Sequence, residues 1–292
     1  MHYSEKTYRP PHEANTVLLQ VTVGCSHNRC RFCNSYKTIR FKVEPMQQIE
    51  EDLKEVQRCA PNTDRIFLLN ADAFVLSYEK LKNLANKIHE YLPKVKTISS
   101  MARVTNMRNK TIEQLKELKA LGYNDLYIGT ESGFDDALSV ADKGHNSSDS
   151  VEQLQKLDEA GYKYTCFYMV GLAGSGNCEK NAVASAKMFN KLKPKRIGVT
   201  SMTIFPDAPF YQDVIEGKLS EASELERTKE LQTFIKHLDT KTYVESIHVT
   251  NGTSLTGNIP EDKESMIEKL QEIIDNFDEY SARHRRQNLR SV

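Results

Sequence analysis

The chain has 292 residues, of which 40 are basic and 40 are acidic, so its formal net charge is zero. This length suffices for one large α/β domain or two small ones. The balanced charge argues against wholesale binding to nucleic acid or to an anionic membrane surface. No stretch approaches the ~20 apolar residues of a membrane span, and the first residues form no apolar signal peptide. We therefore expect a cytoplasmic protein.

Strand-like and helix-like segments alternate along the chain. In chain order, strands are predicted at residues 16–22, 66–69, 95–99, 125–129, 164–170 and 196–201, and helices follow them at 46–59, 78–91, 111–121, 149–160, 178–192 and 223–238. Apolar residues at Ile49, Leu53 and Val56 have the spacing of one helix face. Thr111 is a suitable N-cap for the third helix, and Gly122 is a suitable stop after it.

This alternation predicts an α/β fold with right-handed crossovers and a parallel sheet. Six strand–helix units are fewer than the eight of a complete TIM barrel, so we expect a partial (β/α)6 TIM-like barrel with a C-terminal α/β extension. Residues 1–240 would form the core. Residues 241–292 would form an extension packed on it, with a strand at 243–249, a loop rich in Gly, Thr and Asn, and a helix at 261–280. Active sites of such barrels lie at the C-terminal ends of the strands.

Three of the six cysteines fall within nine positions, as Cys25-x4-Cys30-x2-Cys33, directly after the first predicted strand. In a cytoplasmic chain, clustered cysteines indicate a metal or redox site more often than disulfides. Thiolates are soft ligands for iron–sulfur clusters or zinc. Three of them can hold three irons of a [4Fe–4S] cluster and leave the fourth iron open to another ligand.

The alternative is structural zinc with His27 as the fourth ligand, in a zinc-stabilised barrel that acts as a binding or scaffold protein. Zinc ligands of this type usually come as two separated pairs. Crowding all four into one loop is less usual, so the spacing favours an iron–sulfur cluster.

The cysteine motif resembles that of the radical S-adenosylmethionine (SAM) superfamily, in the branch with the Elp-three/MiaB-type and oxygen-independent coproporphyrinogen oxidase-like core. The resemblance covers residues 15–211. That family usually has Cys-x3-Cys-x2-Cys with an aromatic residue before the last cysteine. Here Phe32 has the aromatic position, and the gap between Cys25 and Cys30 is one residue longer.

Further segments resemble the family's motifs in the same order, each after a predicted strand. Residues 70–74 (NADAF) stand where the family has a glycine-rich stretch that meets the SAM amino group, so side chains are expected to help there. Residues 127–133 (YIGTESG) and 143–145 (KGH) resemble the "I-G-x-E-S-G" and "basic-Gly-His" segments, and residues 169–174 and 204–211 resemble the adenine-side and closing segments. The resemblance places Glu131 against the methionyl part or ribose of SAM and Lys143 against its carboxylate.

The resemblance also implies two cofactors, a [4Fe–4S] cluster and SAM. It gives Cys25, Cys30 and Cys33 as the cluster ligands, and Phe32, Asn70, Ala71, Asp72, Arg103, Glu131, Ser132, Lys143, Gly171 and Leu172 as SAM-binding residues. The reaction would be reductive cleavage of SAM to a 5′-deoxyadenosyl radical that abstracts hydrogen from a substrate, in an oxygen-sensitive enzyme. A flavodoxin or ferredoxin would donate the electron. The substrate and the subclass (oxidoreductase, transferase or lyase) stay open, and nothing points specifically to nucleic acid.

Three other features can be explained without a functional role. Cys59 is expected in the core of its helix, where a small apolar residue fits. Cys178 has a minority alternative as a hydrogen donor or a ligand of a second cluster. The basic run Arg283-His284-Arg285-Arg286, with Arg290, is interpreted as a solvated end, with contact to an anionic substrate as the alternative.

Overall fold

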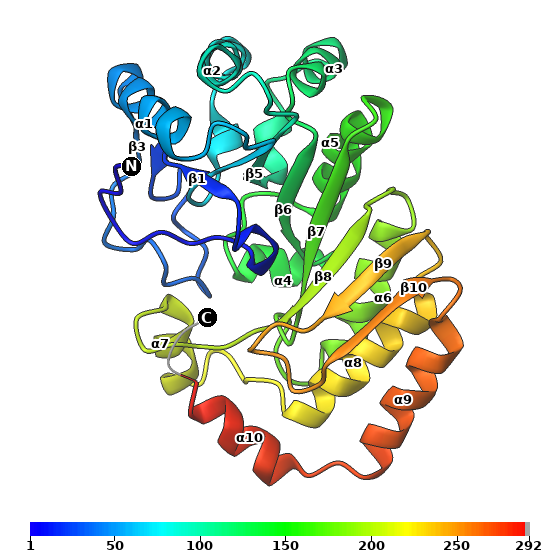
Figure 1. Cartoon of the computed structure of the whole chain (residues 1–292). Helices are drawn as coiled ribbons and strands as arrows, with labels where there is room; N and C mark the ends of the chain where they lie inside the picture. The colour runs from blue at the N-terminus through cyan, green and yellow to red at the C-terminus, as the bar shows by residue number, and fades with distance from the viewer. Residues whose placement is uncertain (290–292) are drawn as a thin grey trace. The chain divides into compact units, whose positions relative to one another are not determined.

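The structure is a computed structural model that describes residues 1–289 and divides them into two compact units (Figure 1). Unit 1 comprises Met1–Asn28, Ser35–Gly129 and Gln153–Tyr164. Unit 2 comprises Arg29–Asn34, Thr130–Glu152 and the described chain from Thr165 onward. Both units contain strands that alternate with helices, so the predicted α/β class is confirmed.

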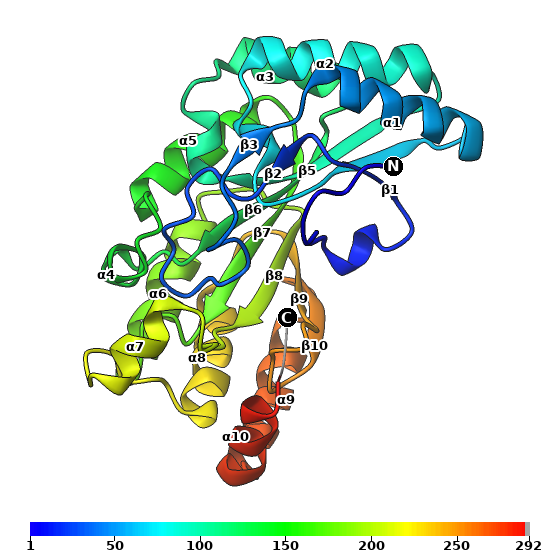
Figure 2. The ribbon, with the colours of Figure 1, turned by 90° about the vertical axis from the view of Figure 1, so that its left-hand side faces the viewer.

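Unit 1 contains four neighbouring strands that run parallel. In spatial order they are β1 (Val17–Leu19), β4 (Arg65–Leu68), β5 (Thr97–Arg103) and β6 (Asp125–Glu131), whose last two residues belong to unit 2. The helices of unit 1 are α1 (Met46–Cys59), α2 (Tyr78–Tyr91), α3 (Ile112–Ala120) and the end of α5 (Ser147–Glu159). Figures 1 and 2 both show α1, α2 and α3 side by side along one face of these strands.

Local sequence signals account for these helices. Ile49, Leu53 and Val56 are buried along one face of α1, as their spacing predicts. The hydroxyl of Thr111 accepts the backbone N–H of Gln114, at an N···O distance of 3.2 Å, which confirms the predicted cap of α3. Gly122 follows α3 with φ +103°, a conformation that stops a helix and that glycine adopts most easily.

Unit 2 contains the remaining main strands, and the elements of the predicted extension pair with them. The order is β7 (Lys163–Val170, which begins in unit 1), β8 (Arg196–Ser201), β9 (Thr242–Ser246) and β10 (Leu255–Ile259). The helices are α4 (Asp135–Val140), α6 (Cys178–Phe189), α7 (Pro209–Ile215), α8 (Glu224–His237), α9 (Lys263–Asp275) and α10 (Glu279–Gln287). Strands β7, β8 and β9 are parallel, whereas β10 is antiparallel to β9. Helix α8 contacts α6, α9 and α10.

All six predicted strand–helix units are present, and the main strands are parallel apart from β10. Within residues 1–289, neither set of strands closes on itself into a barrel. The boundary expected between residues 240 and 241 stays a prediction. None of the helices across residues 1–289 has the length and apolar character needed to cross a lipid bilayer.

The first predicted strand is two strands in the structure. After β1 the chain leaves the sheet, and β2 (Thr22–Val23) pairs antiparallel with β3 (Lys42–Val43), which the sequence did not predict. The cause is a set of hydrogen bonds to Glu44, whose N–H donates to the Val21 carbonyl at 3.0 Å and whose Oε1 accepts the Gln20 amide at 2.9 Å.

The C-terminal segment also differs from the prediction. The loop expected after residue 249 contains β10, in which Leu255, Gly257 and Ile259 are buried in alternation with exposed residues. The helix expected at 261–280 is two helices, because α9 ends at Asp275 and the side chain of Asp278 starts α10 by accepting the N–H of Ser281 at 3.1 Å. Helices α4 and α7 were not predicted. Cys59 is exposed rather than in the core, because it ends α1 where the helix meets solvent.

Candidate functional site

Cys25 lies in a tight turn of unit 1. It follows Gly24, whose φ is +73°, and its Sγ accepts the backbone N–H of Asn28 at 3.5 Å. Asn28 itself is held by its side chain, which donates to the Tyr36 carbonyl at 2.6 Å. An N–H donor at sulfur favours the thiolate form, and hydrogen bonds to sulfur tune iron–sulfur sites. The turn is therefore suited to present Cys25 as a ligand.

Asp72 fixes the residue after Cys25. Its Oδ1 accepts the backbone N–H of Ser26 at 3.1 Å, and its Oδ2 accepts the Ser26 hydroxyl. Asp72 is fully buried, and this burial raises the pKa of its carboxyl, although the Ser26 bonds and the charge of Arg103 offset part of the shift. The loop after β4 is thus tied to the cysteine loop through a buried carboxylate.

Asn70, in the segment that stands where the family has a glycine-rich stretch, has the backbone conformation of a glycine. Its φ is +77°, in the left-handed region that glycine adopts most easily. Its Nδ2 donates to the Thr22 carbonyl at 2.7 Å, and its Oδ1 accepts the Tyr36 hydroxyl at 3.5 Å. The Asn70 side chain therefore braces β2, while the neighbouring Ala71 is half-buried.

Lys110 connects the loops that follow β4 and β5. Its Nζ donates to the carbonyls of Phe74, at 3.1 Å, and Asn106, at 3.0 Å. The Asn106 side chain accepts the backbone N–H of Arg103 at 2.8 Å, at the end of β5. Burial lowers the pKa of Lys110 to about 8. The sequence held no signal for this role, because a lysine before a helix cap is usually solvated.

Unit 2 holds the other two cysteines of the motif. Cys30 is buried and Cys33 is half-buried, and the N–H of Cys33 donates to the Cys30 carbonyl at 3.3 Å. Phe32, between them, packs against an apolar cluster of unit 2. None of the cysteines within residues 1–289 forms a disulfide bond.

Glu131 and Lys143 form a buried ion pair in unit 2. The Lys143 Nζ lies 2.8 Å from Oε1 of Glu131, and the two side chains are only 7% and 10% exposed. The Nζ also lies 5.6 Å from the centre of the Phe32 ring. Glu131 ends β6 with φ +63°, a left-handed conformation that is strained for a glutamate. The two residues expected at opposite ends of the SAM amino acid are thus partners of each other.

Ser132 and the residue after it join the end of β6 to α6. The Ser132 hydroxyl donates to the Asn181 side chain, and its oxygen accepts the N–H of Phe134 at 2.8 Å. Gly133 has no room for a side chain, because an added Cβ would lie 2.6 Å from the Ala184 carbonyl oxygen. Ser132 is fully buried, so its observed contacts are structural.

Gly171 and Leu172 lie on the loop after β7, which is hydrogen-bonded to the buried carboxylate of Glu230. Gly171 has φ +81°, and its N–H donates to Oε2 of Glu230 at 2.8 Å. Glu230 also accepts the Tyr168 hydroxyl and the Asn181 amide, and burial raises its pKa. The sequence did not reveal Glu230, because it lies in a charged stretch of α8 that is typical of an exposed helix.

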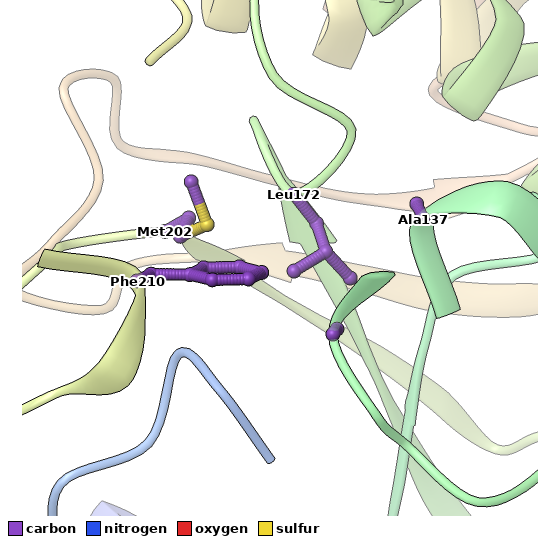
Figure 3. Close-up of a cluster of buried hydrophobic side chains, with 5 residues drawn as sticks. Ala137, Leu172, Met202 and Phe210 are labelled. Carbon is purple, nitrogen blue, oxygen red and sulfur yellow. The ribbon is translucent and has the colours of Figure 1, made fainter. Parts of the chain in front are cut away.

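The side chain of Leu172 lies in an apolar cluster. The cluster consists of Ala137, Ala141, Leu172, Met202 and Phe210. Figure 3 shows the Leu172 side chain pointing toward the Phe210 ring, with Met202 next to the ring. The cluster fills the space at the ends of β7 and β8, where its five side chains are buried against one another.

The predicted site residues thus fall into two groups. Unit 1 contains Cys25, Asn70, Ala71, Asp72 and Arg103, and unit 2 contains Cys30, Phe32, Cys33, Glu131, Ser132, Lys143, Gly171 and Leu172. Among residues 1–289, no three His, Cys, Asp or Glu side chains are already grouped to hold a metal ion, which applies equally to a zinc site with His27. The donor chemistry nevertheless fits an iron–sulfur cluster, because the motif supplies three thiols that form no disulfide bond within one short stretch of sequence.

The basic run near the C-terminus is solvated only in part. Arg286 is buried in unit 2, where it donates to Glu224, to the Met202 carbonyl and to the Ser201 hydroxyl. It therefore links α10 to the end of β8. Because its guanidinium is already hydrogen-bonded within the protein, the role of Arg286 is structural. Arg285 is exposed, as expected, and Arg290 lies outside the described residues.

Comparison with known families and proteins identifies the family of the chain. Residues 19–186 match the family described as the Radical SAM superfamily. The heme chaperone HemW of Bacillus subtilis (strain 168) is 25% identical over 202 residues, which are 67% of this chain and 52% of HemW. The chain thus spans about half the length of that curated relative.

Two solved structures share the fold. The radical SAM methyltransferase TsrM from Kitasatospora setae has a TM-score of 0.57 at 16% identity, over 69% of this chain and 39% of TsrM. The coproporphyrinogen III oxidase HemN from Escherichia coli has a TM-score of 0.55 at 16% identity, over 76% of this chain and 51% of HemN. At such identities the likeness concerns the fold and not the substrate.

Proposed function

We propose, since the chain belongs to the radical SAM superfamily of enzymes, that Cys25, Cys30 and Cys33 hold a [4Fe–4S] cluster and that the enzyme cleaves SAM reductively. One observation carries the proposal. Three cysteines that form no disulfide bond lie within nine positions inside the matched region, and the first of them accepts an N–H at sulfur.

When bound, the cluster would supply the electron with which the SAM sulfonium is cleaved to methionine and a 5′-deoxyadenosyl radical, which takes hydrogen from the substrate. A flavodoxin or ferredoxin is the proposed source of that electron. The chain's own part is to bind and orient SAM and to keep water away from it.

The ion pair of unit 2 has the charges that the amino-acid part of SAM needs. Lys143 would bind the SAM carboxylate and Glu131 the methionyl part or ribose, so the two residues would exchange their present ion pair for contacts with SAM. Lys143 also lies close to Phe32, beside the cysteines.

The remaining residues would orient the rest of the ligand. Gly171 and Leu172 are the proposed neighbours of adenine, on the loop that Glu230 holds through the Gly171 N–H. Asp72 would act by holding the Cys25 turn through Ser26, and Asn70 by bracing β2. Arg103 stays a proposed pocket residue at the end of β5.

The names of the relatives do not point to one substrate, because they include a heme chaperone, a coproporphyrinogen oxidase and a methyltransferase. The proposal therefore covers the cleavage of SAM and leaves the substrate open. The zinc-stabilised scaffold gains no support from these comparisons.

Cleavage of SAM is tested by anaerobic reconstitution with iron and sulfide, followed by SAM and dithionite. We expect the wild-type chain to form 5′-deoxyadenosine and Cys30→Ala to form none above background. Cys59→Ala is the matched control, because Cys59 is exposed and lies outside the motif. Undiminished 5′-deoxyadenosine from Cys30→Ala would refute the assignment.

A further inference from the structure

Arg31 lies between two of the proposed cluster ligands and is bound by a carboxylate far along the chain. Its Nε lies 3.1 Å from Oδ2 of Asp213, and one terminal nitrogen lies 2.6 Å from Oδ1. Both residues belong to unit 2. A two-point contact between guanidinium and carboxylate fixes orientation as well as distance.

The backbone of Arg31 is held on both sides as well. Its N–H donates to the Ala141 carbonyl at 2.9 Å, at the end of α4, and its carbonyl accepts the N–H of Phe210 at 2.9 Å, in the first turn of α7. The guanidinium carbon also lies 6.0 Å from the centre of the Phe210 ring. Backbone and side chain of one residue thus tie the Cys30–Cys33 segment to two helices.

The carboxylate partner is itself fixed. Asp213 lies on α7, whose Phe210 is fully buried in the apolar cluster around Leu172. The Asp213 backbone carbonyl accepts the N–H groups of Lys218 and Leu219, which closes the end of the helix. Arg31 therefore binds a rigid element and not a mobile side chain.

Arg29, two positions earlier, offers an internal comparison. It approaches Asp142 at a single distance of 3.3 Å, and the two side chains are 66% and 43% exposed. The corresponding exposures of Arg31 and Asp213 are 39% and 13%. Solvent screening leaves little energy in the Arg29 pair, whereas the Arg31 pair is partly shielded.

We propose that Arg31 and Asp213 are a positioning pair that holds Cys30 and Cys33 in the arrangement that retains the cluster. The inference rests on the proposed function. Neither residue needs to touch SAM or the reacting atoms. Their effect would be to keep the two thiols from moving apart when a chelator competes for the iron.

The test compares Arg31→Gln and Asp213→Asn with Arg29→Gln in anaerobically reconstituted protein. The measurement is the rate at which an iron chelator removes iron from the reduced protein. We expect release about fivefold faster than wild type for the first two variants, as for the loss of a partly screened charged hydrogen bond, and within about twofold for Arg29→Gln. Equal rates for Arg31→Gln and Arg29→Gln would overturn the proposal.

The double variant Arg31→Asp with Asp213→Arg exchanges the two charges and distinguishes loss of the ion pair from misfolding of the single variants. Restored slow release in the double variant supports a pair, whereas release as fast as in Arg31→Gln contradicts it. Iron-free protein gives a second readout, the alkylation rate of Cys30 by iodoacetamide, which should rise in Arg31→Gln but not in Arg29→Gln. Failure of the wild type to hold iron would refute the proposed function, while the alkylation rates would still decide whether the pair positions Cys30.

Discussion

The two units stabilise their parts of the candidate site by different means. In unit 1, buried charged groups are hydrogen-bonded to neutral partners, since Asp72 accepts from Ser26 and Lys110 donates to two carbonyls. In unit 2, Glu131 is paired with the opposite charge of Lys143, although Glu230 in the same unit also accepts from neutral donors. Burial raises the pKa of Asp72 and lowers that of Lys110.

This difference indicates where each unit is vulnerable. A buried charge bonded to neutral groups costs free energy while it is charged, so pH changes its contribution. A buried ion pair is stable while it is complete, but the loss of one partner leaves the other uncompensated. The Asp72 and Lys110 contacts of unit 1 should therefore respond to pH, and the Glu131–Lys143 pair of unit 2 to removal of one partner.

The largest effect is expected for Lys143→Met. The substitution leaves the Glu131 carboxylate buried without this cation, which should lower the free energy of unfolding by about 3 kcal/mol in urea titrations. The double variant Lys143→Met with Glu131→Gln removes both charges and should recover most of that loss. A single variant as stable as wild type would show that the pair contributes no more than a surface contact.

A pH effect in unit 1 is expected next. Because the pKa of Lys110 is about 8 in the folded chain and higher in the unfolded chain, the unfolded chain binds more protons between pH 8 and about 10.4. The free energy of unfolding of the wild type, relative to Lys110→Met, should therefore rise by about 2 kcal/mol from pH 7.5 to 10.5. Parallel pH profiles for the two proteins would contradict a buried ammonium at this position.

A smaller loss is expected for Asp72→Ala, which leaves the N–H and hydroxyl of Ser26 without this acceptor. The free energy of unfolding of iron-free protein should fall by about 1–2 kcal/mol. Asp72→Asn is the matched control, because an amide can accept from the Ser26 N–H and donate to its hydroxyl. If the two variants lose equal stability, the charge and not the hydrogen bonds holds the turn.

No effect is expected for Cys59→Ser. Cys59 is exposed at the end of α1, so the variant should match wild type in iron content, in unfolding and in 5′-deoxyadenosine formed. Loss of iron in this variant would show that Cys59 contributes to iron binding and would contradict the assignment of three ligands.

The sequence predicted the elements whose signals are local. Helices α1 and α2 begin and end at the predicted residues, since periodicity and capping act within a few positions. The pairing of β2 with β3 and of β10 with β9 depends on partners elsewhere in the chain, so the sequence alone predicts a loop at a short segment such as Leu255–Ile259. The sequence does not predict helix α10, because its residues form a basic run that resembles a solvated end.

The candidate site divides in the same way. The cysteine motif and the residues after the strands could be read from spacing and resemblance. The partners that hold them could not, because Lys110, Glu230 and Asp213 lie far along the chain and look like ordinary exposed charges. Their burial follows from tertiary packing, which a single sequence does not display.

The central claim is that the cysteine triad holds a four-iron cluster with one iron open to SAM. Electron paramagnetic resonance of the reduced, reconstituted protein with and without SAM tests it most directly, together with iron and sulfide analysis. The claim predicts about four irons per chain and a spectrum that changes when SAM is added. A colourless protein with one zinc, or a spectrum that SAM leaves unchanged, would contradict it.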